Sequence, residues 1–438
     1  MTKARRIPPK RPRPRPAPLA ISPTLTRLER DLTRAGGPGT AEGAALLAAF
    51  WSGPGASSPL LEAIPGHPDE LLVTFCWQDA RAERVLLFVN RITDERNLAA
   101  SYLRWVPDTD LWHLSYRMAA DWRASYSYLP QYDVRPAWLD GDDQVAIRAA
   151  LDRGLADPRN PETSRNRPGT LMSVVSLPKA PAQPWLARRP GTPRGTVVER
   201  SGPAGRRVWV YSPPGPMAGP TPLVLVLDGE VWTSSQDLAT TVDNLIDDGR
   251  LAPVHLVMLD SGGQQARWGE LGGPGEVGEY LSGPLLDWAR AEYPVSGRRE
   301  DVVLAGLSLG GLVALRTALE FPTRIGAVLS QSASLWSDDL AGPLAAADVR
   351  GLRAYLEVGS QEWVLAEPNR RFADRLTRAG ADVRFVPYNG GHDYACWRGG
   401  IADGLRHLLP PNQGTVLRSE MGRGAVPRSG SRDDLGNT

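Results

Sequence analysis

A glycine-rich hexapeptide in the second half of the chain has the residue types of a nucleophilic serine site. It reads Gly-Leu-Ser-Leu-Gly-Gly over residues 306–311, follows the strand-like residues 301–305 and leads into a helical pattern. A serine on such a sharp strand-to-helix turn needs small neighbours, because larger side chains would collide with the backbone. Backbone N–H groups at the start of the helix stabilise negative charge that develops there. The pattern predicts Ser308 as a nucleophile; the alternative is an ordinary glycine-rich turn, since GxSxG also occurs by chance.

A nucleophilic serine needs a base, which comes last in the chain order of the α/β-hydrolase fold, after the serine and an acid. Two histidines follow Ser308. His407 lies inside the last helical pattern, whereas His392 stands in a loop just after the last strand-like segment, residues 383–388. A base in that loop can overhang the serine turn. We therefore predict His392 as the general base.

The acid that orients this histidine has several candidates. Glu362 falls in the loop after the strand-like residues 352–359, from which a carboxylate can reach the imidazole and hold its tautomer. Glu357 is still on that strand, and Asp393 is adjacent to the base and poorly placed to orient it. Asp338 and Asp339 are interpreted as solvated turn residues. We favour Glu362 and keep Glu357 and Asp393 as rivals.

The oxyanion of an acyl-transfer reaction needs two N–H donors. The elbow implies the N–H of Leu309, the residue after the nucleophile. The loop after an early strand should supply the second donor, and the Asp-Gly pair that follows residues 222–227 fits, with Gly229 allowing close approach of the backbone. The alternative for this pair is a plain turn.

Buried strands that alternate with helices must position these residues. Long apolar runs in the second half are typical of strands covered on both faces, as in a doubly wound α/β sheet. They are residues 207–212, 222–228, 254–260, 301–306, 325–332, 352–359 and 383–388. We expect an α/β-hydrolase domain over residues 205–410 that ends in an amphipathic helix.

The first half of the chain has a different period. Two short helical patterns, 25–34 and 42–51, precede β-rich runs separated by polar turns. Short strands at this spacing favour an all-β, immunoglobulin-like sandwich, which we place at residues 25–175. A proline-rich linker over residues 176–204 joins it to the second half.

Charge and composition exclude several functions. Residues 1–20 contain seven Lys or Arg and no acid, so the near-neutral total of +1 hides a net charge of about −7 over residues 21–410. A nucleic-acid binder should show a basic folded domain, so this class is disfavoured. The basic, proline-rich leader, residues 1–24, and the tail, residues 411–438, are predicted to be disordered. Two cysteines in 438 residues exclude a disulfide scaffold and a cysteine-based metal site.

The chain contains no apolar run long enough to span a membrane. No apolar stretch of the length of a signal peptide follows Arg5 and Arg6 either. We expect a cytoplasmic protein.

Several motifs resemble those of the enterochelin esterases, which are esterase D-like hydrolases with an amino-terminal β-sandwich. The motifs are LDGEVW (227–232), ARWGEL (266–271), GLSLGGLVAL (306–315), LSQSASLW (329–336) and GGHDYACWRGG (390–400). In the first half, residues 73–79, 111–130 and 156–164 are also similar. The resemblance covers roughly residues 70–410. The Gly-rich, acidic stretch after Leu271 departs from the family pattern. The individual contacts to the substrate therefore stay open.

This resemblance implies a cytoplasmic serine esterase that opens the trilactone of ferric catecholate siderophores such as enterobactin. Iron then enters only as part of the substrate, with no cofactor or metal site, and the oligomeric state stays open. The resemblance also strengthens Glu362 as the acid. The alternative is a feruloyl or acetyl carbohydrate esterase, or another esterase D-like acyl hydrolase, because the aromatic sandwich strand resembles carbohydrate-associated domains. A non-catalytic binding module is a third, disfavoured reading.

Substrate contacts follow from the same resemblance. Arg267 matches a basic family position that meets the anionic iron–catecholate; the alternative is a surface ion pair with Glu270. Trp232 is expected to stack on a catechol ring, or to belong to the core. Trp397 and Arg398 line the same mouth, or anchor the final helix. The sandwich is expected to cover part of the mouth, whose local basic lining must overcome the acidic body.

Overall fold

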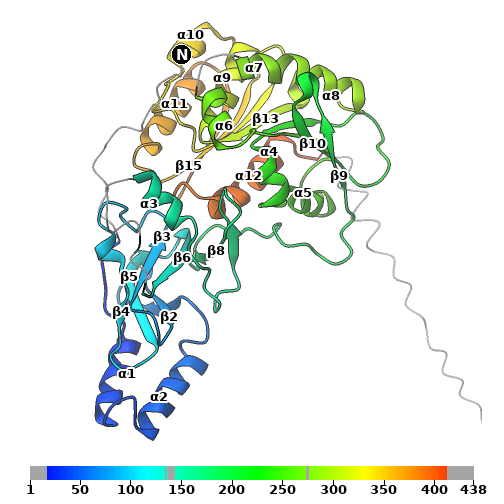
Figure 1. Cartoon of the computed structure of the whole chain (residues 1–438). Helices are drawn as coiled ribbons and strands as arrows, with labels where there is room; N and C mark the ends of the chain where they lie inside the picture. The colour runs from blue at the N-terminus through cyan, green and yellow to red at the C-terminus, as the bar shows by residue number, and fades with distance from the viewer. Residues whose placement is uncertain (1–16, 134–135, 137–143, 273–275, 412–438) are drawn as a thin grey trace, which may run out of the picture.

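A computed structural model describes residues 17–133, 136, 144–272 and 276–411. Within these residues the first half of the chain forms a β-sandwich that packs against an α/β domain formed by the second half (Figure 1). The predicted fold class, an α/β-hydrolase domain preceded by a β-sandwich, is confirmed. No helix in these described ranges is both long and apolar enough to cross a bilayer.

Two antiparallel four-stranded sheets form the sandwich, with strand orders β1-β2-β5-β4 and β3-β6-β8-β7. The strands are β1 Leu60–Ala63, β2 Glu70–Gln78, β3 Arg84–Val89, β4 Arg104–Trp105, β5 Leu111–Ala119, β6 Arg123–Gln131, β7 Thr163–Arg165 and β8 Leu171–Ser176. Alternate residues of each strand face inwards, so Val73 and Phe75 of β2 share one core with Val85 and Leu87 of β3. Helix α3, Gln144–Leu151, packs on the β3 side through Ile147.

The two helices before the sandwich, α1 Pro23–Arg34 and α2 Ala41–Ser52, confirm the first two helical patterns. They cover the outer face of one sheet, where Leu25 and Leu28 pack with Cys76 and Leu111. Helix α1 begins after Ser22, whose side chain accepts the N–H of Leu25 and so caps the helix.

Two predicted boundaries are wrong. Leu19 forms a β-bridge with Tyr116 and Ser22 caps α1, so the part of the leader from residue 17 onwards is ordered. The end of the predicted linker forms strand β9, Thr196–Ser201. This strand pairs with β10 and is the edge strand of the sheet in the α/β domain. The predictions for residues 1–16 and 412–438 lie outside the described residues.

The α/β domain is built on an eight-stranded sheet of order β16-β15-β14-β13-β11-β12-β10-β9. Strand β10 is antiparallel to both of its neighbours, β12 and β9, and all other neighbouring strands pair in parallel. The strands are β10 Arg207–Ser212, β11 Leu223–Leu227, β12 His255–Leu259, β13 Val302–Leu307, β14 Ala327–Gln331, β15 Arg353–Gly359 and β16 Asp382–Tyr388.

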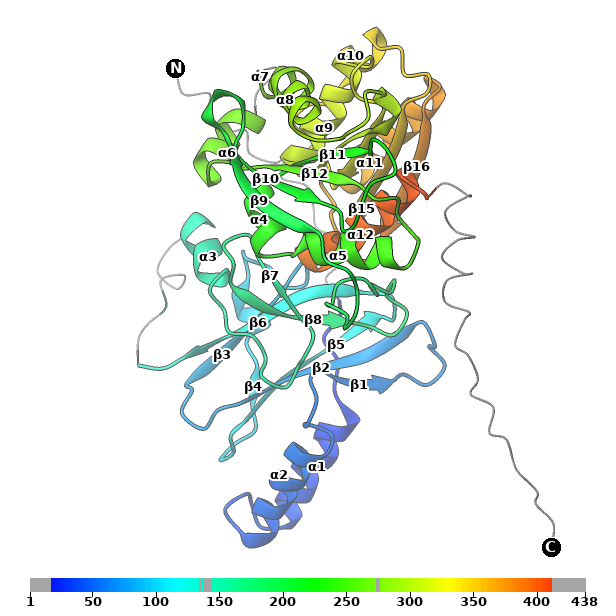
Figure 2. The ribbon, with the colours of Figure 1, turned by 90° about the vertical axis from the view of Figure 1, so that its right-hand side faces the viewer.

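Helices cover both faces of this sheet, as Figure 2 shows. Alternate residues of β11 point to opposite faces, Leu225 to the core under one layer and Val226 to the core under the other. One layer contains α7 Glu276–Tyr280, α8 Leu286–Glu292, α9 Leu309–Glu320 and α11 Ala366–Arg378; the other contains α4 Gly229–Ser234, α5 Leu238–Asp247 and α12 Tyr394–Leu408. Two further helices, α6 Gln264–Leu271 and α10 Ala341–Ala346, lie near α9.

The two domains meet along α12, which contacts β6 and β7 of the sandwich. The loop between β16 and α12 is hydrogen-bonded to β6 at two points. The N–H of Arg123 donates to the carbonyl of Asn389 (3.0 Å), and the N–H of Ser125 donates to the carboxylate of Asp393 (2.6 Å). The loop that carries His392 is therefore held from both domains.

Candidate active site

Ser308 stands on a strained turn between β13 and α9. Its backbone has φ 58° and ψ −119°, a region that residues other than glycine rarely adopt. A Cβ on Gly306 would lie 2.4 Å from the backbone of Gly310, so the turn needs glycine there. The N–H of Ser308 donates to the carbonyl of Gln331 on β14 (2.8 Å), which fixes the turn to the sheet. This geometry is that of a nucleophile elbow.

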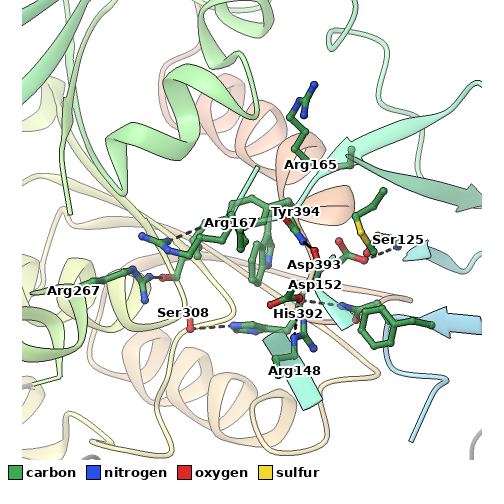
Figure 3. Close-up of a pocket in the computed structure, with 18 residues that line it drawn as sticks. Ser125, Arg148, Asp152, Arg165, Arg167, Arg267, Ser308, His392, Asp393 and Tyr394 are labelled. Atoms are coloured by element: carbon green, nitrogen blue, oxygen red, sulfur yellow. Dashed lines mark hydrogen bonds and ion pairs between the residues drawn. The ribbon is translucent and has the colours of Figure 1, made fainter. Parts of the chain in front are cut away.

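The three residues predicted as nucleophile, base and acid come together at the carboxyl ends of the strands. His392 Nε2 lies 3.0 Å from Ser308 Oγ, and His392 Nδ1 lies 2.5 Å from Glu362 Oε2. The contact between His392 and Ser308 is the dashed line that joins them in Figure 3. Glu362 is 1% exposed, whereas the His392 side chain keeps 28% of its surface open. A buried acid, a partly open base and a serine in this order can carry out acyl transfer.

Hydrogen bonds keep Glu362 in its charged form. Ser332 Oγ donates to Glu362 Oε1 (2.6 Å), and so does the N–H of Gly359 (2.9 Å). Burial alone would raise the pKa of Glu362, but the charge and hydrogen bond of His392, with help from Arg91 and Ser332, hold that pKa below its ordinary value. The carboxylate is thus ionised where it can orient the imidazole.

The rival acids occupy other positions. Glu357 accepts from Gln331 Nε2 (2.6 Å), and burial raises its pKa to about 8. Asp393 caps α12 through the N–H of Ala395 (3.0 Å) with one oxygen and accepts the N–H of Ser125 with the other. Asp338 and Asp339 pair with arginines, Arg316 and Arg375 respectively, and are not solvated turn residues alone.

A pocket of about 190 Å³ opens over Ser308 and His392, and both domains line it (Figure 3). From the α/β domain come Arg267, Leu307, Ser308, His392, Asp393, Tyr394 and Trp397; from the sandwich half come Phe88, Asn90, Ser125, Arg148, Asp152, Ser164, Arg165, Asn166, Arg167, Pro168 and Met172. The expectation that the sandwich covers part of the mouth agrees with this lining.

The lining is basic. Four arginines, at positions 148, 165, 167 and 267, face two acids, Asp152 and Asp393. Arg148 pairs with Glu95 and Asp152, whereas Arg165 donates only to the carbonyl of Gly169 (2.7 Å) and makes no ion pair with any described residue. The pocket thus carries positive charge within an acidic body.

Arg267 does not form the surface ion pair with Glu270 that was its alternative. It is 7% exposed and forms a two-pronged ion pair with Asp228, at 2.5 and 2.7 Å, while Glu270 pairs with Arg206. Arg167 of the sandwich half donates to the same Asp228 (3.0 Å). Burial would raise the pKa of Asp228, but these two arginines hold it below its ordinary value. Arg267 still lines the pocket, but the carboxylate of Asp228 neutralises part of its charge.

Two predicted substrate contacts are wrong. Trp232 is 1% exposed and packs edge-on against Tyr394, because α4 turns it into the core, so it cannot stack on a ligand. Arg398 lies outside the pocket lining. Its guanidinium donates to Gln183, to the carbonyl of Thr163 and to Glu162, so it fastens α12 to the segments before and after β8.

The two predicted oxyanion donors lie at the ends of neighbouring strands. Leu309 begins α9, and Gly229 begins α4 after Asp228, which adopts a left-handed conformation (φ 63°). A Cβ on Gly229 would lie 2.5 Å from the carbonyl of Met258, so the backbone approach there requires glycine. The role of both N–H groups as an oxyanion hole stays a prediction.

Sequence reasoning missed Arg148, Arg165 and Arg167. For Arg165 and Arg167 the local signal was the run Ser-Arg-Asn-Arg-Pro-Gly at residues 164–169, the first five positions of which line the pocket. Nothing in that run indicates the distant α/β domain against which it docks.

Comparisons with known proteins agree with this architecture. The family described as "Enterochelin esterase, N-terminal" matches residues 72–186, and the family described as "Putative esterase" matches residues 203–408. An iron(III) enterobactin esterase of Escherichia coli is 31% identical over 78% of this chain and 92% of its own length. An iron(III) salmochelin esterase of the same species is 32% identical over 79% and 90%.

Solved structures extend the likeness to three dimensions. The ferric enterobactin esterase of Salmonella typhimurium is 29% identical, with a TM-score of 0.71 over 82% of this chain and 98% of that one. The enterobactin esterase of Shigella flexneri, solved in the presence of enterobactin, is 28% identical, with a TM-score of 0.69 over 82% and 97%. Both halves of the chain match, in sequence and in fold, and the chain belongs to the enterochelin (enterobactin) esterase family.

Proposed function

We propose that this protein is a serine esterase that hydrolyses the ester bonds of ferric catecholate trilactones of the enterobactin class. The observation that carries the proposal is the hydrogen-bonded series Ser308–His392–Glu362 at the floor of an arginine-lined pocket. The family relatives, whose names give iron(III) enterobactin and iron(III) salmochelin as substrates, support the substrate class.

The chemistry follows from the hydrogen bonds. Ser308 Oγ attacks a lactone carbonyl while His392 Nε2 takes its proton, and the charge on Glu362 stabilises the imidazolium. The N–H groups of Leu309 and Gly229 are the proposed donors to the oxyanion. His392 then returns the proton to the departing seryl hydroxyl. Water, activated by the same histidine, releases the acid and restores Ser308.

The positive lining matches the charge of the substrate. Catecholate groups around one ferric ion carry more negative charge than the iron neutralises, so the chelate is an anion. The body of the protein, residues 21–410, carries about −7 and repels it at long range. The arginines of the pocket, with Arg165 free of any carboxylate among the described residues, supply the local attraction. The acyl-transfer steps use protein groups alone, and iron enters as part of the substrate.

We also propose that the protein acts in the cytoplasm. Its two cysteines, Cys76 and Cys396, are both buried and unpaired, a state that suits a reducing compartment. Fractionation of the native host should recover the protein with cytoplasmic markers; recovery with secreted proteins would contradict this location.

The function is tested with purified protein on a panel of esters. The panel contains iron-loaded and iron-free trilactone, p-nitrophenyl acetate and a feruloyl sugar ester, and products are separated by chromatography. We expect linear dihydroxybenzoylserine species from the trilactones. Ser308→Ala should lower kcat by about 10⁴-fold or more, because a nucleophile has been removed. Ser282→Ala, which lies outside the pocket lining, should retain activity. Cleavage of feruloyl sugar with intact trilactone would overturn the proposal in favour of a carbohydrate esterase.

A further inference from the structure

Trp397 contacts the base of the triad with its ring and the acid through one hydroxyl. The residue lies on α12 and is 2% exposed. Its ring stands edge to face against the imidazole of His392, with centroids 4.5 Å apart and planes at 85°. Its Nε1–H donates to Ser332 Oγ (3.0 Å), the hydroxyl that donates to Glu362 Oε1.

The direction of these hydrogen bonds is fixed by chemistry. An indole N–H can only donate, so Ser332 Oγ must accept from Trp397. A serine hydroxyl donates one hydrogen bond. The 2.6 Å contact indicates that Ser332 donates it to Glu362 rather than to Tyr388, whose OH lies 3.4 Å away. Ser332 itself is held with φ 50°, and its N–H donates to the carbonyl of Glu357 (2.7 Å). The hydroxyl therefore has little freedom to turn unless the indole donor is removed.

A backbone contact connects Trp397 to the nucleophile as well. Gln331 Nε2 donates to the carbonyl of Trp397 (2.8 Å), and the carbonyl of the same Gln331 accepts the N–H of Ser308 (2.8 Å). Trp397 thus contacts His392 directly and is hydrogen-bonded to one partner of Glu362 and one partner of Ser308.

We propose that Trp397 is a positioning residue of this esterase: its ring fixes the plane of His392, and its N–H directs the Ser332 hydroxyl onto Glu362. The inference rests on the proposed function only in taking Ser308, His392 and Glu362 as the catalytic groups. It holds for any ester that the triad cleaves.

The proposal predicts a defined change in the imidazole. When Ser332 no longer donates steadily to Oε1, more negative charge stays on Glu362 to face His392 Nδ1, which favours the imidazolium. In the pH profile of kcat/KM, activity falls on the acid side when the base of the free enzyme becomes protonated. We expect this acid limb to move to higher pH. The other charged groups that line the pockets around His392 are Arg91, Glu95, Arg148, Asp152, Arg165, Arg167, Arg267 and Asp393, and the substitutions below leave them in place.

The experiment compares two Trp→Phe variants of the full chain. Trp397→Phe keeps an aromatic ring beside His392 and removes the N–H donor. Trp232→Phe is the matched control, because Trp232 is equally buried and its Nε1 has no hydrogen-bond partner among the described residues. Ser332→Ala removes the hydroxyl itself. The measurements are kcat, KM and the pH profile with p-nitrophenyl acetate, and the rate at which a fluorophosphonate labels Ser308.

We expect Trp397→Phe to lower kcat and the labelling rate by roughly 10-fold, as small misplacements in active sites do, with KM unchanged. Its acid limb should rise by about half a pH unit. Trp232→Phe should change neither. Ser332→Ala should shift the limb in the same direction, and adding Trp397→Phe to it should produce little further shift, because both act through one hydroxyl.

Results that contradict the role of Trp397 can be told apart from results that contradict the proposed function. A folded Trp397→Phe variant with normal kcat and an unmoved acid limb would overturn the inference, and so would an effect on KM alone, which would make Trp397 a substrate contact. Equal losses in both Trp→Phe variants would show a packing effect. If the wild type leaves trilactones intact but hydrolyses the aryl ester or reacts with the fluorophosphonate, the substrate proposal fails while this comparison is still decided.

Discussion

His392 Nδ1 and Glu362 Oε2 lie 2.5 Å apart, although 30 residues and the whole of α11 and β16 separate them in the chain. The contact forms because β15 and β16 are parallel neighbours, so the loops at their carboxyl ends lie side by side. Glu362 is buried and His392 is not, which leaves the imidazole free to reach Ser308 with its other nitrogen. Glu357 provides a comparison for this acid, because it is also buried and lies on β15, the strand that precedes Glu362.

Glu362→Gln and Glu357→Gln are therefore matched substitutions with different expected outcomes. Glu362→Gln removes the charge that orients His392 and stabilises its protonated form, so kcat should fall by about 10³-fold or more. Glu357, with a pKa of about 8, already holds a proton at pH 7, and glutamine imitates that neutral form. Steady-state kinetics at pH 7 should show near-normal activity for Glu357→Gln. The reverse ranking would transfer the role of acid to Glu357.

The same Glu357 predicts how the free energy of unfolding depends on pH. Burial raises its pKa from 4.5 in the free side chain to about 8, so between these values the folded state binds more protons than the unfolded state. Stability contributed by this proton is complete below about pH 4.5 and is lost as pH rises through about 8. Urea denaturation at pH 5 and pH 8.5 should show Glu357→Gln gaining on the wild type as pH rises. A constant difference between the two proteins would show that Glu357 is ionised when folded.

Asp393→Asn should affect both stability and turnover. An amide that keeps the cap of α12 turns its NH₂ towards the N–H of Ser125, which loses its buried acceptor, so the free energy of unfolding should fall by about 1–3 kcal/mol. Asp393 directly follows His392, so a shift of this loop should displace the base. We therefore expect kcat to fall as well, with KM little changed. Denaturation and kinetics should be compared with Asp69→Asn, an exposed carboxylate of the sandwich. Wild-type kinetics in Asp393→Asn would separate the domain contact from the base.

Arg165→Gln should change binding of charged substrate only. The guanidinium makes no ion pair among the described residues, so its charge is available to an anion at the pocket. We expect KM for ferric trilactone to rise several-fold at low salt, with the difference shrinking as salt screens the charge. The kinetics of neutral p-nitrophenyl acetate should stay constant. Arg153→Gln, an exposed neighbour outside the pocket, is the control. An equal loss on both esters would argue that Arg165 shapes the site rather than attracting its substrate.

The sequence was sufficient to predict which catalytic candidates meet. Glycine spacing around Ser308 indicates the turn, and the loops after two later strands must lie at the same edge of a parallel sheet. Strand order therefore favours Glu362 and His392, but it left Glu357 and Asp393 open as rival acids. The alternation between apolar strands and helices likewise predicted the layers of the α/β domain. These features are local or follow from the topology of a sheet.

The sequence did not reveal features that arise from docking between distant segments. Arg148, Arg165 and Arg167 become pocket residues only because the sandwich packs over the α/β domain. Trp232 and Arg398 were expected at the mouth, yet α4 turns the first into the core and the second fastens α12 to the sandwich. Whether an aromatic or a cation near a site faces solvent depends on a helix's rotation against its neighbours, which a short motif does not specify.

The two hydrogen bonds from β6 to the His392 loop make the support of the base depend on the contact between the domains. A hinge motion that parted the domains would break the bonds to Asn389 and Asp393 and withdraw their share of the support for the base. A conformation with the domains apart would therefore support His392 with fewer contacts, and we expect it to hydrolyse esters more slowly.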